Sequence, residues 1–174
     1  MKLDLREIIG VPGGRVAFDY EPDLSDAVDG SIVLVRKPSR AAGSVVNKAG
    51  VLTLTANVDA ILVCVCARCL KEFEYPVHKQ VETYLTEEGE GGSADSYFLQ
   101  GDMADVGSII LTEFILGTDD RMLCSGDCAG LCTGCGADLN TEQCSCGVEI
   151  DSRLAVLRQL LDVEGGVSNG STKE

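Results

Sequence analysis

Six of the nine cysteines lie in one short polar stretch, and their spacing is that of metal ligands. Cys132 and Cys135 are separated by two residues, which places both sulfurs on one side of a tight turn, and Gly136 follows where the chain can reverse. Cys144 and Cys146 form another pair shortly afterwards. Because Zn²⁺ takes four ligands in a tetrahedron, this spacing predicts a closed site of four thiolates at these four positions.

The remaining two cysteines of the stretch, Cys124 and Cys128, have no partners in their own segment. Much earlier in the chain, Cys66 and Cys69 offer another spacing of two residues. If folding brings these pairs together, they form a second four-thiolate site that fastens a hairpin to the C-terminal region. Other subsets of the six neighbouring thiols stay open. Cys64 is expected to be a small buried hydrophobic residue, with replacement of one ligand as the alternative.

The expected metal is structural Zn²⁺, as one or two ions. An iron–sulfur cluster and redox-active or unligated thiols are the alternatives, because soft thiolates also bind iron. All-thiolate zinc sites are closed to water, and the only histidine, His78, is expected to be an exposed strand residue rather than a ligand or general base. The sequence has no glycine-rich phosphate loop and no nucleophile elbow. We therefore expect neither an enzyme nor a small-molecule substrate.

Composition indicates a folded chain, since 45% of the 174 residues are hydrophobic and 24% are charged. The first residues lack the apolar run of a secretory signal. The longest uncharged apolar stretch, residues 60–67, is far shorter than the roughly 20 residues that a membrane-spanning helix needs. We expect a cytoplasmic protein, in which a reducing environment disfavours disulfides and favours metal binding by cysteine.

The net charge of −14 opposes non-specific attraction to nucleic acid, which depends on Lys and Arg. The charge is uneven, because the segment from Arg36 to Lys79 holds seven basic and three acidic residues. Ordinary solvated charge is one explanation of this segment. The other is contact with RNA or a partner, for which the candidate residues are Arg36, Lys37, Arg40, Arg68 and Lys71.

Alternating hydrophobicity predicts an α+β fold whose first part, residues 1–85, is rich in β structure. The expected strands cover residues 15–20, 31–36, 51–65 and 73–85, with a hairpin turn at 47–50. They would form an antiparallel sheet or a partial barrel, and a second hairpin would carry the first CxxC pair at its tip. Pro76 indicates an edge strand or a bulge.

A helix that covers one face of the sheet is expected over residues 104–117, with Asp105 as its cap and Gly117 at its end. An acidic, glycine-rich loop is expected before it, over residues 86–103.

The cysteine-rich zinc-knuckle segment, residues 124–147, precedes a terminal helix predicted over 151–163, where leucines lie on one stripe. Residues 1–163 are expected to form a single domain. Residues 164–174 are expected to be a disordered tail.

With these motifs assembled, the chain resembles the YceD family, the large ribosomal RNA subunit accumulation proteins of bacteria and plastids. Three stretches carry the resemblance: Cys66-Ala-Arg-Cys69-Leu-Lys-Glu-Phe-Glu-Tyr-Pro, Cys128-Ala-Gly-Leu-Cys132-Thr-Gly-Cys135-Gly-Ala-Asp-Leu-Asn140 with Cys144-Ser-Cys146, and Ile150-Asp-Ser-Arg-Leu-Ala-Val-Leu157. The resemblance implies a non-enzymatic ribosome biogenesis factor that is needed for 23S ribosomal RNA to accumulate.

Thr133 and Ser152 stand where relatives tend to have proline, but neither change removes a ligand or a cap. Because some relatives lack the C-terminal cysteine cluster, the resemblance places the shared function on the β region and hairpin. The partners to expect are large-subunit ribosomal RNA or a basic ribosomal protein, which would suit an acidic surface. The alternatives are a thiol-based zinc or redox sensor and a zinc-dependent protein-interaction module unrelated to RNA.

Overall fold

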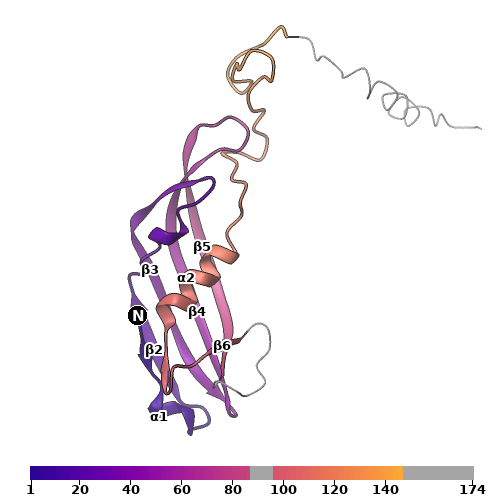
Figure 1. Ribbon diagram of the computed structural model, residues 1–174. Helices are drawn as coiled ribbons and strands as arrows, with labels where there is room; N and C mark the ends of the chain where they lie inside the picture. Colours follow the sequence, from indigo (N-terminus) through magenta and orange to yellow (C-terminus); the bar gives the residue numbers. More distant parts are fainter. Residues whose placement is uncertain (87–95, 147–174) are drawn as a thin grey trace, which may run out of the picture. The chain divides into compact units, whose positions relative to one another are not determined.

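The computed structural model describes residues 1–86 and 96–146, which are mainly β sheet with two α-helices (Figure 1). The α+β prediction is therefore confirmed. The chain divides into two compact units, the first Met1–Leu131 and the second beginning at Cys132. The terminal helix predicted over 151–163 and the tail over 164–174 lie outside the described residues. The single domain expected over 1–163 includes such residues and stays a prediction.

The first unit is built on a five-stranded sheet with the order β2-β3-β4-β5-β6. Strands β2 (Arg15–Tyr20), β3 (Ile32–Lys48), β4 (Val51–Val65) and β5 (Glu72–Thr86) are antiparallel neighbours, and the short β6 (Ser96–Phe98) runs parallel to the end of β5. This order leaves β2 and β6 at the two edges. The predicted sheet is thus correct, and the described strands do not close into the partial barrel that was its alternative.

Strand β3 is much longer than the strand predicted over 31–36. Its second half is rich in small residues, which show no alternating hydrophobic pattern although the backbone pairs with both β2 and β4. Gly43 is needed there because a Cβ atom at this position would overlap the carbonyl oxygen of Thr55 on β4. The predicted turn after β3 is confirmed, with positive φ at Ala49 and Gly50.

The loop predicted over 86–103 is wrong in part. β5 includes Thr86, and β6 pairs beside it, with the N–H of Leu99 donating to the Thr86 carbonyl at 2.9 Å. A two-residue strand, β7 (Met103–Ala104), pairs with β1 (Leu3–Asp4). Strands this short show no hydrophobic period, so only their pairing identifies them. Residues 87–95 lie outside the described residues.

Helix α2 (Val106–Leu116) lies across one face of the sheet (Figure 1). It begins as predicted, because the Asp105 carboxylate accepts a hydrogen bond from the N–H of Ser108 at 3.2 Å, and it ends at Gly117. The other helices are short, α1 (Arg6–Ile9) and the 3₁₀ helix η1 (Ser25–Ala27). No helix among the described residues is long and apolar enough to cross a membrane.

The core lies between α2 and the facing side of the sheet. Alternate residues of β4 point toward it because successive side chains of a strand face opposite sides. The side chains that form its centre have no exposed surface: Leu54, Val58, Leu62, Val106, Ile110 and Phe114.

A buried asparagine, Asn47, joins the β3–β4 turn to α1. Its Nδ2 donates to the carbonyl oxygens of Ile8 and Ile9 at 2.8 Å, and its Oδ1 accepts from the N–H of Gly50 at 2.7 Å. Only 1% of Asn47 is exposed. We expect Asn47→Ala to lower the free energy of unfolding by about 2–3 kcal/mol, because buried backbone groups lose their partners. Thermal unfolding would measure the loss, and a similar loss from Asn57→Ala, at an exposed position on β4, would contradict it.

Candidate metal centres

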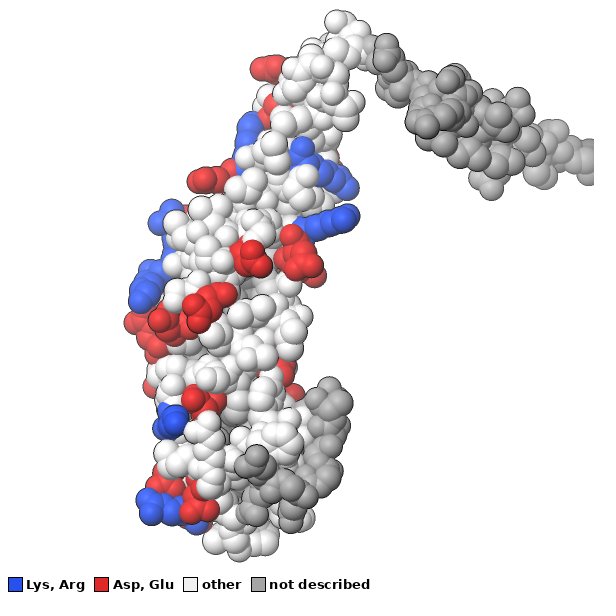
Figure 2. All heavy atoms as spheres, viewed as in Figure 1, with Lys and Arg blue, Asp and Glu red and all other residues white. Residues whose placement is uncertain are grey.

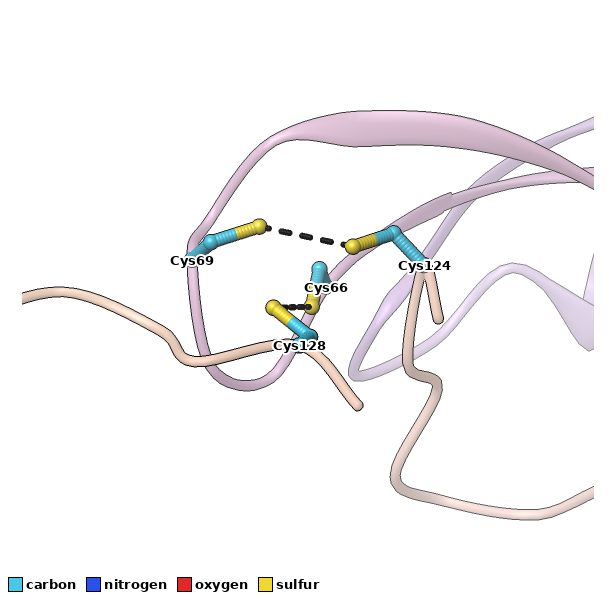
Figure 3. A group of neighbouring side chains, drawn as sticks. All are labelled: Cys66, Cys69, Cys124 and Cys128. Atoms are coloured by element: carbon cyan, nitrogen blue, oxygen red, sulfur yellow. Dashed lines mark hydrogen bonds between the residues drawn. The ribbon is translucent and has the colours of Figure 1, made fainter. Parts of the chain in front are cut away.

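The first cysteine group joins the β4–β5 turn to the segment that follows α2. Cys66 and Cys69 lie on the turn, Cys124 and Cys128 lie on the later segment, and the four Sγ atoms are within 4.8 Å of one another (Figure 3). The Sγ atoms of Cys66 and Cys128 are 3.8 Å apart, and those of Cys69 and Cys124 are 3.6 Å apart. A tetrahedral zinc ion with bonds of about 2.3 Å holds its sulfurs about 3.8 Å apart. The separations therefore suit Zn²⁺.

The second cysteine group lies entirely within the second unit. The Sγ atoms of Cys132, Cys135, Cys144 and Cys146 are within 4.8 Å of one another, and those of Cys132 and Cys144 are 3.2 Å apart. The structure thus gathers the eight cysteines into the two sets that their spacing indicated. All eight donors are sulfur, which suits zinc and other soft metals. Ligation itself stays a prediction.

The turn of the first group is held by three hydrogen bonds around Cys66. Its N–H donates to the Lys71 carbonyl at 2.9 Å, its carbonyl accepts from the N–H of Leu70 at 2.9 Å, and its Sγ accepts from the N–H of Arg68 at 3.5 Å. Leu70 has a φ of +59°, the left-handed conformation that lets the chain reverse after the second cysteine.

The turn of the second group repeats this pattern position by position. Cys132 donates to the Ala137 carbonyl at 2.8 Å, accepts from the N–H of Gly136 at 2.8 Å, and accepts at Sγ from the N–H of Gly134 at 3.4 Å. Gly136 has a φ of +75° and occupies the place that Leu70 has in the first turn. Both turns aim amide hydrogens at a cysteine sulfur, which stabilises the thiolate form that a metal needs.

These amide hydrogens lower the pKa of one thiol in each group. Burial raises the pKa of Cys66, but hydrogen bonds from the backbone of Cys124, Cys69 and Arg68 outweigh it and bring the pKa to about 6. The pKa of Cys124 rises to about 12, mainly because its sulfur lies beside that of Cys69. The two shifts are opposite, so an ionised Cys66 lies near a thiol that keeps its proton, and a divalent cation would allow both to ionise.

The second group shows the same division. The backbone of Cys135 and the thiol of Cys144 lower the pKa of Cys132 to about 6. The neighbouring thiol of Cys135 is the main cause that raises the pKa of Cys146 to about 12. Four thiols held this closely cannot all ionise unless a cation compensates their charge.

Apolar side chains and further hydrogen bonds surround the first group. Phe73, Leu123 and Leu131 pack against its three buried cysteines, which are Cys66, Cys69 and Cys128. The later segment is also tied to the turn by its backbone: the N–H of Ala67 donates to the Met122 carbonyl at 2.8 Å, and the N–H of Leu131 donates to the Arg68 carbonyl at 3.1 Å. The hairpin tip is therefore fastened by backbone hydrogen bonds as well as by the clustered sulfurs.

The family model described as "Large ribosomal RNA subunit accumulation protein YceD" matches residues 54–161, which is more than half of the chain. The chain belongs to the YceD family. The matched segment includes both cysteine groups and confirms the resemblance found in the sequence. Neither the comparison with curated proteins nor that with solved structures gave a match.

In this YceD family member, Cys64 lies outside both cysteine groups. It is completely buried in the main core, where burial raises the pKa of its thiol, as expected for a small hydrophobic residue. His78 is an exposed residue of β5, again as expected, and its Nδ1 lies 2.6 Å from a carboxylate oxygen of Asp59.

The five basic residues predicted to contact RNA or a partner come from two places in the sheet, and their contact stays a prediction. Three of them, Arg36, Lys37 and Arg40, lie on β3, whereas Arg68 and Lys71 lie on the β4–β5 turn. On the face shown in Figure 2, Lys and Arg side chains are interspersed with Asp and Glu.

Three of these basic side chains have partners within the protein, two of them carboxylates and one a backbone carbonyl. Arg36 lies 2.6 Å from a Glu74 carboxylate oxygen, and Arg40 pairs with both oxygens of Asp19 at 3.0 and 2.6 Å. Sequence reasoning missed these pairs. It also missed that Arg68 donates from Nη1 to the Cys128 carbonyl at 2.9 Å, which makes it part of the first cysteine group's support. The position of Arg68 between Cys66 and Cys69 was the sequence feature that could have indicated this role.

Leu70 offers a test of the turn geometry. It is 64% exposed and holds a left-handed conformation that costs L-residues roughly 1–2 kcal/mol, so we expect Leu70→Gly to raise the free energy of unfolding by about 0.5–1 kcal/mol. Thermal unfolding would measure this gain. Gly130→Ala should act in the opposite direction, since Gly130 has a φ of +78° and a Cβ atom there would lie 3.0 Å from the Arg68 carbonyl oxygen. A loss of stability in Leu70→Gly would contradict the argument.

Proposed function

We propose that this chain is a non-enzymatic, cytoplasmic factor that supports the accumulation of large-subunit ribosomal RNA and is stabilised by two structural zinc ions. The family match over residues 54–161 carries the first part of this proposal, since the printed family name describes that role. The two groups of four cysteine sulfurs support the second part.

In this proposal the residues of the first group hold zinc as a fastener rather than as a reactive centre. Cys66, Cys69, Cys124 and Cys128 would bind the ion, which supplies a cross-link between the hairpin tip and the chain after α2. The hydrogen bond from Arg68 to the Cys128 carbonyl orients the later segment toward the turn. A rigid hairpin end would then present the β region to its partner.

The partner that the charges favour is a basic ribosomal protein rather than RNA. The chain carries a net charge of −14, and Arg36 and Arg40 already pair with carboxylates. Phosphates would have to displace those carboxylates, whereas a basic protein would meet a complementary surface.

Depletion of the protein in its own cells tests the function. We expect large-subunit ribosomal RNA to fall relative to small-subunit ribosomal RNA, and the wild-type gene to restore the ratio. An unchanged ratio after full depletion would contradict the proposed role. A gene that carries Cys69→Ser should restore the RNA ratio only as far as folded protein remains in the cell. A ratio that follows the amount of folded protein indicates a structural role for Cys69 rather than a catalytic one.

Crosslinking in cells tests the partner. We expect recovery of RNA no better than that of an unrelated acidic protein, together with crosslinks to a basic ribosomal protein. Recovery of large-subunit RNA at specific positions would instead assign the contact to RNA, and an Arg36→Glu/Arg40→Glu double variant would then lose it.

A further inference from the structure

The two cysteine groups differ sharply in how well they are shielded. In the first, Cys66, Cys69 and Cys128 are 0%, 4% and 3% exposed and lie within an apolar cluster. In the second, Cys135 and Cys146 are exposed and the other two cysteines are half-buried. None of the described residues from 132 to 146 is fully buried. In the first group Cys124 alone is exposed, so a competing ligand has free access to only one of its four sulfurs, whereas all four cysteines of the second group are exposed or half-buried.

The groups also differ in what must break before a sulfur can move away. To open the first group, the chain must separate the hairpin turn from the later segment, which breaks the Ala67–Met122 and Leu131–Arg68 backbone bonds and the bond from the Arg68 side chain. That movement would also expose the apolar residues packed around the sulfurs.

The second group closes a short loop within its own unit, in which Cys132 and Cys144 are 12 positions apart. Residues 144–146 form the arm of this loop, and two of the hydrogen bonds that hold the arm go to sulfur. The Cys144 thiol donates to the Cys132 sulfur, and the N–H of Cys146 donates to the Cys144 sulfur. Gly134 lets the arm approach closely, since a Cβ atom there would lie 3.3 Å from the Cys146 sulfur. The arm can thus leave without disturbing a hydrophobic core.

We propose that the second group is an exchangeable zinc site, whereas the first keeps its ion for as long as the fold persists. This inference rests on the zinc binding proposed above. In the exchange, a soft competing ligand takes the Zn²⁺ through the exposed side, the zinc–sulfur bonds break one after another, and the freed thiolates other than that of Cys132 take up protons from water. The first unit stays folded, so zinc availability controls the folding of residues 132–146 alone.

The test follows zinc release from the full-length protein into excess pyridylazoresorcinol, a chromophoric chelator, after total zinc has been measured by elemental analysis. We expect two zinc ions per chain and two phases of one ion each, with rates at least about tenfold apart. Cys146→Ser should remove the fast phase and leave the slow one. Ser145→Ala, at the exposed neighbouring position, should keep both.

The outcomes separate this inference from the proposed function. Two ions that leave in a single phase, or a fast phase that persists in Cys146→Ser, would overturn the exchangeable site while leaving structural zinc intact. A protein that carries no zinc as purified would overturn both zinc proposals, but not the role in ribosomal RNA accumulation. Thermal unfolding after the fast phase should still show the transition of the first unit, and its loss would equally overturn the inference.

Discussion

Replacement of Cys66 by serine is expected to remove one of two zinc ions and to lower the free energy of unfolding of the first unit by more than about 3 kcal/mol, a fraction of the roughly 10–16 kcal/mol that structural zinc provides in zinc-finger peptides. The sulfur of Cys66 lies at the centre of the turn, where it faces Cys128 at 3.8 Å and accepts the N–H of Arg68. Three sulfurs would remain, and a serine hydroxyl is a poor fourth ligand for zinc at neutral pH.

Elemental analysis and thermal unfolding measure the two parts of this result. Cys64→Ala is the matched control, because Cys64 lies two residues earlier on the same strand but belongs to the main core. Cys64→Ala should lower the free energy of unfolding by only about 1 kcal/mol, because it leaves a small cavity, and it should not change the zinc content. Equal zinc loss in both variants would show that Cys64 takes part in ligation, which was the alternative left open by the sequence.

Acidification is expected to weaken zinc binding by about a thousandfold per pH unit near pH 7. An ordinary thiol carries its proton at this pH, so zinc must displace protons from the ligands. The thiols of Cys66 and Cys132, whose pKa values are lowered to about 6, are already ionised, which leaves about three protons to displace in each group. Below pH 6 a fourth proton joins them, and the dependence steepens toward ten-thousandfold per unit.

In the metal-free protein, the same two thiols also make the free energy of unfolding depend on pH. A cysteine whose pKa falls from 9.0 to about 6 on folding contributes stability that is present above pH 9 and is lost as the pH falls through 6. Competition with a chelator of known affinity at pH 8, 7 and 6 would measure the zinc dependence. Binding that changes less than about tenfold per unit would mean that most ligands are ionised beforehand, and would contradict the proton count.

The long regular strands were predictable because their side chains alternate between a buried and an exposed face. β4 and β5 lie close to their predicted bounds, and the Asp105 cap begins α2. The second half of β3 was not predictable in this way. Its Ala41, Gly43 and Ser44 carry no hydrophobic pattern, and what makes them a strand is pairing with β2 and β4, which a single sequence does not display.

The two cysteine sets were predictable because a four-thiolate zinc site requires a characteristic number and spacing of cysteines, and these cysteines have it. The surroundings were not. Leu70 takes a left-handed conformation for which the sequence offers no glycine, and Arg68 turns toward a carbonyl 60 positions later. The basic residues could not be interpreted for a related reason, since their carboxylate partners are set by the sheet. Arg40 meets Asp19 on the neighbouring β2, and Arg36 meets Glu74 on β5, two strands away.

The time that separates the synthesis of the cysteines differs between the two groups. Cys69 and Cys124 are 55 positions apart, so at roughly 5–20 residues per second the hairpin tip waits about 3–11 s for its other two thiols. Cys132 and Cys144 are 12 positions apart, and closing so short a loop costs less entropy once both are made. During synthesis the half-built hairpin therefore displays a pair of thiols and an exposed leucine while the sheet beneath it is already complete through β5. The first cysteine group can be completed only after the ribosome has synthesised α2 and the segment that follows it.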